Sequence, residues 1–171
     1  MKRVAIIVTI GLFFTSCVIT MSYKSGKLRK SYSSNYRKTQ KILSLMKKDF
    51  NKRKNIYNSL SLKYEKLLSK DYYKLNNLLE NMSNIINKVE KDEKNYRIIR
   101  DDIYRLTENK KKIKSNKPEW EKYNKIEDRA KILNSRLEKL SKNYRKLSKN
   151  YNHTLKRVKK SIFKIEKKRR K

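Results

Sequence analysis

The sequence is poor in the residues that reverse a chain and poor in acidic side chains. Its 171 residues include only 2 Gly and 1 Pro, whereas sheet enzymes and nucleotide-binding folds need turn residues between many short elements. The 16 acidic residues stand against 49 basic ones, a formal net charge of +33, which predicts a negatively charged partner. With 36% hydrophobic residues and a mean hydropathy of −1.02, the chain cannot fill a thick globular core. The fold classes that remain possible are a thin helical assembly and a disordered chain.

Residues that carry chemistry are equally scarce. His153 is the only histidine and Cys17 the only cysteine, so no internal disulfide can form. The acidic pair Asp101 and Asp102 and the acidic residues around Glu90 are flanked by Lys and Arg, and helical ion pairing explains them without a metal. There is no phosphate-binding glycine loop and no nucleophile motif. The sequence therefore predicts no enzyme, no catalytic residue, no metal site and no cofactor.

The first residues have the layout of an export signal. Lys2 and Arg3 form a basic head, an apolar run extends over residues 4–14, and Thr15 and Ser16 precede Cys17. These residues resemble the lipobox of bacterial lipoprotein precursors, although Phe14 replaces the usual Leu. The resemblance covers residues 1–17 only. It implies that a signal peptide of residues 1–16 is removed and that Cys17 carries acyl chains such as palmitate, followed by a short tether over 17–29.

An uncleaved anchor is the alternative interpretation of the same segment. Residues 4–21 form an 18-residue, nearly uncharged stretch that is long enough for a single membrane-spanning helix. Lys24, Lys27, Arg29 and Lys30 follow it and outnumber the basic residues before it, which favours a cytoplasmic C-terminal side. The expected location is the cell envelope, with the exported protein held at a membrane, and a single-pass anchor remains open.

The rest of the chain predicts an all-α fold. Apolar residues recur at alternating intervals of three and four, the pattern of a coiled coil. We expect a long helix over 30–113, with a possible break near 69–71 where the heptad spacing stutters. A turn over 114–117 and a second helix over 118–171 should follow, because Pro118 suits only a first helical turn. The two helices would fold into a long antiparallel hairpin. Arg53, Glu93 and Lys110 interrupt the first apolar stripe.

A short repeat lies in the second helix. KLSKNYR at 139–145 is followed directly by KLSKNYN at 146–152. Each copy places Leu and Tyr on the apolar stripe, with Lys and Ser outside it. Duplication within a coiled coil explains the repeat, and a Lys-Tyr surface that binds a ligand is the alternative.

Basic charge is concentrated in two separate stretches. Residues 22–70 have a net charge of +13 and residues 139–171 of +14, whereas residues 71–138 have only +4. Folding at residue 115 would bring both basic stretches to the end nearest the membrane anchor. The predicted polyanion-binding residues are Lys156, Arg157, Lys159, Lys160, Lys167, Lys168, Arg169, Arg170 and Lys171.

These observations predict an envelope lipoprotein that acts as an elongated coiled-coil scaffold or spacer. Its basic, membrane-proximal end would bind anionic lipids or envelope polymers. Being exported, basic and hairpin-like, the chain is also similar in composition and shape to the Skp family of periplasmic chaperones, which implies a holdase as one alternative. A membrane-tethered nucleic-acid binder is another, although most tyrosines of the second helix fall on the apolar stripe and nucleic acid is not the expected partner. A two-helix hairpin leaves an exposed flank, so a homo-oligomer is expected.

Overall fold

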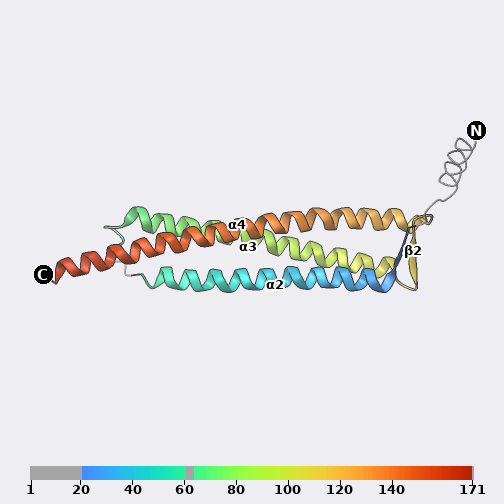
Figure 1. Cartoon of the computed structure of the whole chain (residues 1–171), viewed down its shortest axis with the longest axis horizontal. Helices are drawn as coiled ribbons and strands as arrows, with labels where there is room; N and C mark the ends of the chain where they lie inside the picture. The colour runs from blue at the N-terminus through green and yellow to red at the C-terminus, as the bar shows by residue number, and fades with distance from the viewer. Residues whose placement is uncertain (1–20, 61–63, 171) are drawn as a thin grey trace, which may run out of the picture.

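Three long helices make up nearly all of the structure. The computed structural model describes residues 21–60 and 64–170 (Figure 1). In chain order the elements are β1 (Ser22–Lys24), α2 (Ser25–Asn58), α3 (Ser69–Leu106), β2 (Lys112–Lys114) and α4 (Pro118–Arg169). The helices lie side by side and reverse direction at each connection, so α3 is antiparallel to both α2 and α4 (Figure 1). Consequently α2 and α4 run in the same direction.

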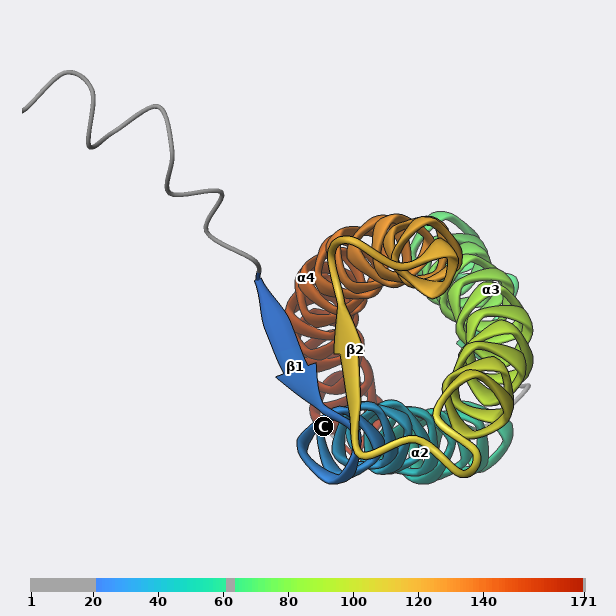
Figure 2. The same ribbon diagram turned by 90° about the vertical axis from the view of Figure 1, so that its right-hand side faces the viewer.

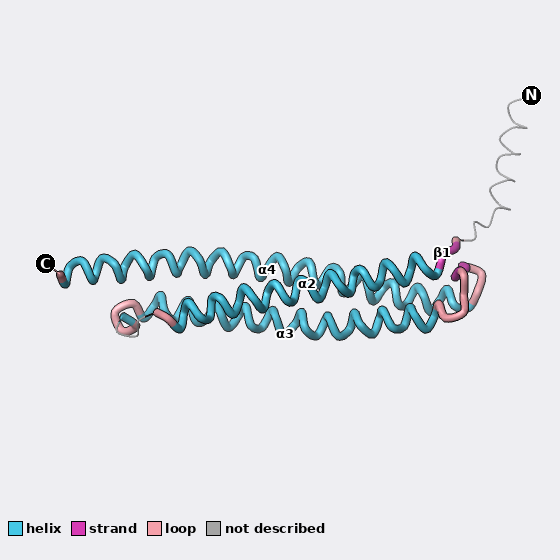
Figure 3. The backbone as a smooth tube through the Cα atoms, turned by 90° about the horizontal axis from the view of Figure 1, so that it is seen from below, coloured by secondary structure: helices cyan, strands magenta, loops and turns pink. Residues whose placement is uncertain are grey.

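The two ends of the bundle differ in construction. At one end, here called the strand end, β1 pairs antiparallel with β2 and Ser22 lies opposite Lys114. Figure 2 shows both strands crossing this end of a triangular arrangement of helices. At the other end, the turn end, residues 59–68 connect α2 to α3. The C-terminal part of α4 extends beyond this connection (Figure 3). The 52 residues of α4 correspond to about 78 Å at ~1.5 Å per residue.

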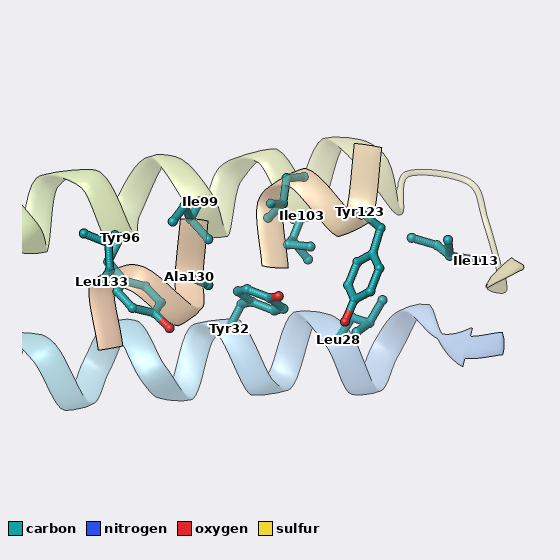
Figure 4. Close-up of a cluster of buried hydrophobic side chains, with 10 residues drawn as sticks. Leu28, Tyr32, Tyr96, Ile99, Ile103, Ile113, Tyr123, Ala130 and Leu133 are labelled. Carbon is teal, nitrogen blue, oxygen red and sulfur yellow. The ribbon is translucent and has the colours of Figure 1, made fainter. Parts of the chain in front are cut away.

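Three buried clusters follow one another along the bundle axis. The strand-end cluster joins all three helices and β2, and its central residues appear in Figure 4. Its members are Leu28, Tyr32, Tyr96, Ile99, Ile103, Ile113, Tyr123, Ile126, Ala130 and Leu133. The middle cluster contains Met46, Met82, Ile85, Ile86, Val89, Leu137 and Tyr144. The turn-end cluster contains Leu60, Tyr72, Leu75, Leu78, Leu79, Tyr151, Leu155 and Val158. Each apolar stripe thus supplies the core, as the heptad spacing predicts.

The all-α class and the antiparallel packing of long helices are confirmed, whereas the number of helices differs from expectation. The single helix expected over 30–113 is two helices, because the chain reverses fully between Asn58 and Ser69. The expected break near 69–71 is therefore the start of α3. The expected turn over 114–117 is a longer connection that includes β2, and the expected second helix from residue 118 is present as Pro118–Arg169.

The segment expected to be a tether is part of the fold. Within 17–29, residues 22–24 form β1 and Ser25 begins α2. The backbone N–H of Ser25 donates a 3.0 Å hydrogen bond to the carbonyl oxygen of Lys111. The ring of Tyr23 stacks on Trp120 with the centroids 5.6 Å apart. These contacts fix the start of α2 against the start of α4 at the strand end.

The reversal at 59–68 is made without glycine or proline. The Ser59 hydroxyl donates to the Ile56 carbonyl at 2.8 Å, which satisfies an acceptor at the end of α2. Leu60 and Tyr64 then turn inward and are buried. The Tyr64 hydroxyl donates to Glu166 Oε1 on α4 at 2.7 Å. The turn is therefore held by contacts with a helix about a hundred residues away, and local turn residues are not needed.

Candidate interaction surface along α2 and α4

Positive charge is distributed unequally among the three helices. Within α2 there are eleven basic residues and one acidic residue, a net charge of +10. Within α4 there are eighteen basic and six acidic residues, a net of +12. By contrast, α3 has eight basic and seven acidic residues, a net of +1. The excess charge therefore lies on the two parallel helices α2 and α4.

Along α4 the net positive charge is confined to the turn-end half. Residues 118–138 contain five basic and five acidic side chains, and residues 139–169 contain thirteen basic and one acidic. Within the described residues, Arg157 with Asp71 is the one ion pair that involves a basic side chain of 139–169. The remaining charge in this half is left to solvent or to a partner.

The last turns of α4 are held against the 59–68 connection. Glu166 accepts the hydrogen bond from Tyr64, and the guanidinium of Arg169 lies over the Tyr64 ring, 6.0 Å from its centroid. A cation over an aromatic face is an attractive contact. Helical structure continues to Arg169, so the predicted polyanion-binding residues up to that point are on an ordered helix.

The structure corrects the expected position of these residues. The prediction placed the basic tail beside the N-terminal segment, because a two-helix hairpin returns the chain to its start. With three helices, α4 ends at the turn end, whereas Ser22 lies at the strand end (Figure 1). The two basic stretches are still adjacent, since the later parts of α2 and α4 both approach the turn end. The stretch 139–171 is distant from the point where the N-terminal segment enters the fold, whereas the stretch 22–70 begins there.

Arg53 forms a buried polar cluster between α2 and α4, here called the Arg53 clasp. Its guanidinium donates to both carboxylate oxygens of Asp49, at 2.8 and 3.0 Å. Across the seam it donates to Ser148 Oγ at 2.6 Å and to Asn152 Oδ1 at 2.6 Å. The Arg53 residue is only 8% exposed. A charge so buried is tolerated because it is paired and hydrogen-bonded.

Two tyrosines of α4 donate hydrogen bonds across the same seam to the backbone of α2. The hydroxyl of Tyr144 donates to the Met46 carbonyl at 2.9 Å, and that of Tyr151 donates to the Arg53 carbonyl at 2.9 Å. Burial is the main cause that raises the pKa of both phenols above the ordinary value of 10.0, and the pKa of Tyr151 rises to about 12. For Tyr144, the nearby Asp49 carboxylate adds to the increase. The seven-residue repeat of the sequence thus makes the same backbone contact twice.

An open groove of about 1220 Å³ lies beside this seam. On α2 it extends from Asn35 to Asp49, and on α4 from Asn134 to Lys149. It forms because α3 packs closely along both neighbours, whereas α2 and α4 approach each other less closely.

Most of the predicted site residues are exposed, and two of them, Cys17 and Lys171, lie outside the described residues. Of the polyanion-binding set, the structure describes all members except Lys171, and all of these are exposed. Cys17 and the whole signal segment 1–16 lie outside the described residues, so lipidation stays a prediction. The lone histidine, His153, is exposed on α4.

Arg53 is the seam residue that the sequence pattern does not identify. By heptad spacing it interrupts the apolar stripe, whereas in the structure it belongs to the seam. A signal was available, because Asp49 precedes Arg53 by four residues, which is ion-pair spacing on a helix.

Within 21–60 and 64–170, no three His, Cys, Asp or Glu side chains gather as a metal-binding group. In the same ranges, no helix combines the length and the apolar character needed to cross a membrane. Comparisons with protein families, with curated proteins and with solved structures found no match to this chain. The holdase and nucleic-acid-binding hypotheses stay predictions.

Proposed function

We propose that this protein is an elongated helical scaffold, tethered to a membrane through its N-terminal segment, that binds a polyanion with the turn-end half of α4. The observation that carries the proposal is the charge of residues 139–169, with thirteen basic side chains and one acidic. Among the described residues, Arg157 is the one cation of this stretch that forms an ion pair with an acidic side chain. A surface of this kind attracts anionic polymers and anionic lipid headgroups.

The shape of the bundle supports a spacer role. The N-terminal segment joins the fold at the strand end, and the basic half of α4 lies toward the turn end. The rod length of about 78 Å far exceeds the Debye length of about 8 Å at physiological salt. A membrane at the strand end would therefore have little electrostatic effect on the turn end. The proposed scaffold holds its polyanion at a distance from its own anchor.

Polyanion binding is tested with a four-lysine variant and a matched control. The test variant changes Lys156, Lys159, Lys160 and Lys164 to Gln. The control changes Lys88, Lys91, Lys94 and Lys122 to Gln, which removes the same charge from exposed positions away from the turn end. With labelled inorganic polyphosphate as the probe, the test variant should bind on the order of tenfold more weakly, and the control should change far less. Equal losses in both variants would show that net charge alone governs binding, and the proposal would fail.

Tethering is tested separately. Incorporation of labelled palmitate in cells should be abolished by Cys17→Ala. Labelling that persists in this variant would contradict lipidation at Cys17. The polyphosphate experiment does not depend on the result, because it uses purified protein.

A further inference from the structure

The groove between α2 and α4 is open because a polar clasp is missing from it. At its turn-end limit, Arg53 crosses the seam and bonds to Ser148 and Asn152. One heptad earlier the equivalent residue is Met46, which is packed in the middle cluster. Its backbone carbonyl accepts the hydrogen bond from Tyr144, but its side chain makes no polar contact across the seam. The hydroxyl of Ser141, which corresponds to that of Ser148, is buried without a hydrogen-bond partner. The seam is thus closed at one heptad and open at the preceding one.

The dimensions of the groove suit a single helix. Its lining spans residues 35–49 of α2 and 134–149 of α4, which is about 21–22 Å at ~1.5 Å per residue. That length corresponds to roughly four helical turns, or a segment of about 15 residues. The two walls are parallel helices whose third neighbour, α3, is on the opposite side. A helix in the groove would convert this part of the bundle from three helices to four.

The floor and the rim of the groove differ in character. The apolar part of the lining comes from Ile42, Met46 and Leu137, together with Leu45. Leu45 is 57% exposed. The rim contains five cations and only two carboxylates. The cations are Lys38, Lys142, Arg145, Lys146 and Lys149.

The rim cations are not neutralised within the described residues. No ion pair there involves any of the five. Of the two carboxylates, Asp49 is already occupied by Arg53 and Tyr144, so only Glu138 remains. Four of the five cations lie on α4 and one on α2. An apolar floor beside such a basic rim matches a helix with one apolar stripe flanked by acidic residues.

From this complementarity we infer that the groove binds an acidic amphipathic helix of a partner protein. A second copy of this chain is a poor occupant because its helices α2 and α4 are basic and its net charge is +33. Four of the five rim cations also belong to the basic stretch 139–169, but the two proposals can be tested separately, since the groove ends at Lys149 and the lysines that test the polyanion site begin at Lys156.

The test uses two synthetic 15-residue peptides of identical Glu, Ala and Leu composition. In the first, Leu recurs at three- and four-residue spacing and forms one helical stripe, and in the second the order is scrambled. Binding of each labelled peptide to the purified protein is measured by fluorescence anisotropy. The striped peptide should bind, and the scrambled peptide should bind at least tenfold more weakly.

Matched variants locate the binding surface. Leu45→Asn should weaken binding of the striped peptide roughly tenfold, because a side chain that the helix would cover becomes polar. Ile98→Asn, at a similarly exposed position of α3 outside the groove, should change it less than twofold. Circular dichroism establishes that both variants remain helical. The four-lysine variant at Lys156, Lys159, Lys160 and Lys164 should retain peptide binding, which separates this inference from the polyanion proposal.

Four outcomes would overturn the inference. Equal binding of the striped and scrambled peptides, or equal effects of Leu45→Asn and Ile98→Asn, would show attraction by charge alone. Vesicles of phosphatidylglycerol that bind in a Leu45-dependent manner and displace the peptide would identify the occupant as a lipid. A concentration-dependent dimer that Leu45→Asn abolishes in sedimentation would identify it as a second copy.

Discussion

The seam between α2 and α4 contains the sequence KLSKNY twice, and the two copies meet different residues of α2. Tyr144 and Tyr151 make the same bond to a backbone carbonyl, and Ser141 and Ser148 occupy equivalent positions. Three of the differences bear on the polar contacts across the seam. The later heptad has Asp49, Arg53 and Asn152 where the earlier one has Ile42, Met46 and Arg145.

These three differences decide whether the seam is closed or open. Asp49, Arg53 and Asn152 form a hydrogen-bonded set in which every charge has a partner. In the earlier heptad, Met46 turns into the middle cluster and Arg145 belongs to the rim of the groove. The repeat on α4 therefore makes the same tyrosine contact twice, whereas Asp49 and Arg53 of α2, together with Asn152 at the end of the second copy, give the later heptad its polar cluster. Each prediction below changes one member of this comparison.

Replacing Arg53 with Met should have the largest effect on stability. The change makes the later heptad resemble the earlier one, but it leaves Asp49 without its cation and Ser148 and Asn152 without their donor. Breaking a largely buried ion pair from one side costs about 3 kcal/mol, and urea unfolding should show a loss of about that size. The adjacent exposed residue provides the control, since Lys54→Met should change stability by less than about 0.5 kcal/mol. Similar losses in both variants would contradict a structural role for the clasp.

Alkaline pH should destabilise the tyrosine contacts. Burial raises the pKa of Tyr151 from the ordinary value of 10.0 to about 12 in the folded protein. A raised folded-state pKa means that the stabilisation is fully present below pH 10 and is lost as pH rises from 10 to 12. Two pKa units correspond to about 2.7 kcal/mol, of which about 2 kcal/mol is lost by pH 12. The difference in unfolding free energy between the natural protein and Tyr151→Phe should therefore shrink and then reverse sign over this range. A difference that stays constant would contradict the burial of this hydroxyl.

The sequence predicted the all-α class, the antiparallel packing of long helices and the start of α4, but only part of the seam. Heptad spacing indicates which face of a helix is buried, and Pro118 indicates where a helix begins. The reversal at 59–68 has no comparable signal, because Leu60 and Tyr64 are held there by packing against α4. Missing this reversal also misplaced the basic tail at the membrane-proximal end.

The candidate groove was less predictable than the charge. Net charge by segment can be counted from the sequence, and it located the basic stretches that the structure places on α2 and α4. The groove depends on which residue of α2 faces each copy of the repeat. That register arises from the three-helix packing. From the sequence alone, Arg53 therefore resembles an interruption of the apolar stripe, because its partners on α4 are not apparent.

Removing the Tyr144 hydroxyl should have an intermediate effect. In Tyr144→Phe the hydrogen bond to the Met46 carbonyl is lost, and the 3.2 Å contact with Asp49 Oδ2 is lost with it. A net cost of about 1 kcal/mol is typical for a buried hydrogen bond. The Tyr151→Phe variant loses only a carbonyl contact, so its cost at neutral pH should be equal or smaller. A larger cost for Tyr151→Phe would indicate that the Asp49 contact contributes nothing.

The smallest and most discriminating effect should come from the two serines. Ser148→Ala removes the acceptor of an Arg53 hydrogen bond and should destabilise the protein by about 1 kcal/mol. Ser141→Ala removes a buried hydroxyl that has no partner, so it should be neutral or stabilising by about 0.5 kcal/mol. Both changes bring the same gain in helix propensity, and the difference between the variants therefore isolates the clasp. Urea unfolding of the pair measures it directly. Equal effects would mean that the two copies of the repeat are energetically alike, and the explanation of the groove by a missing arginine would not hold.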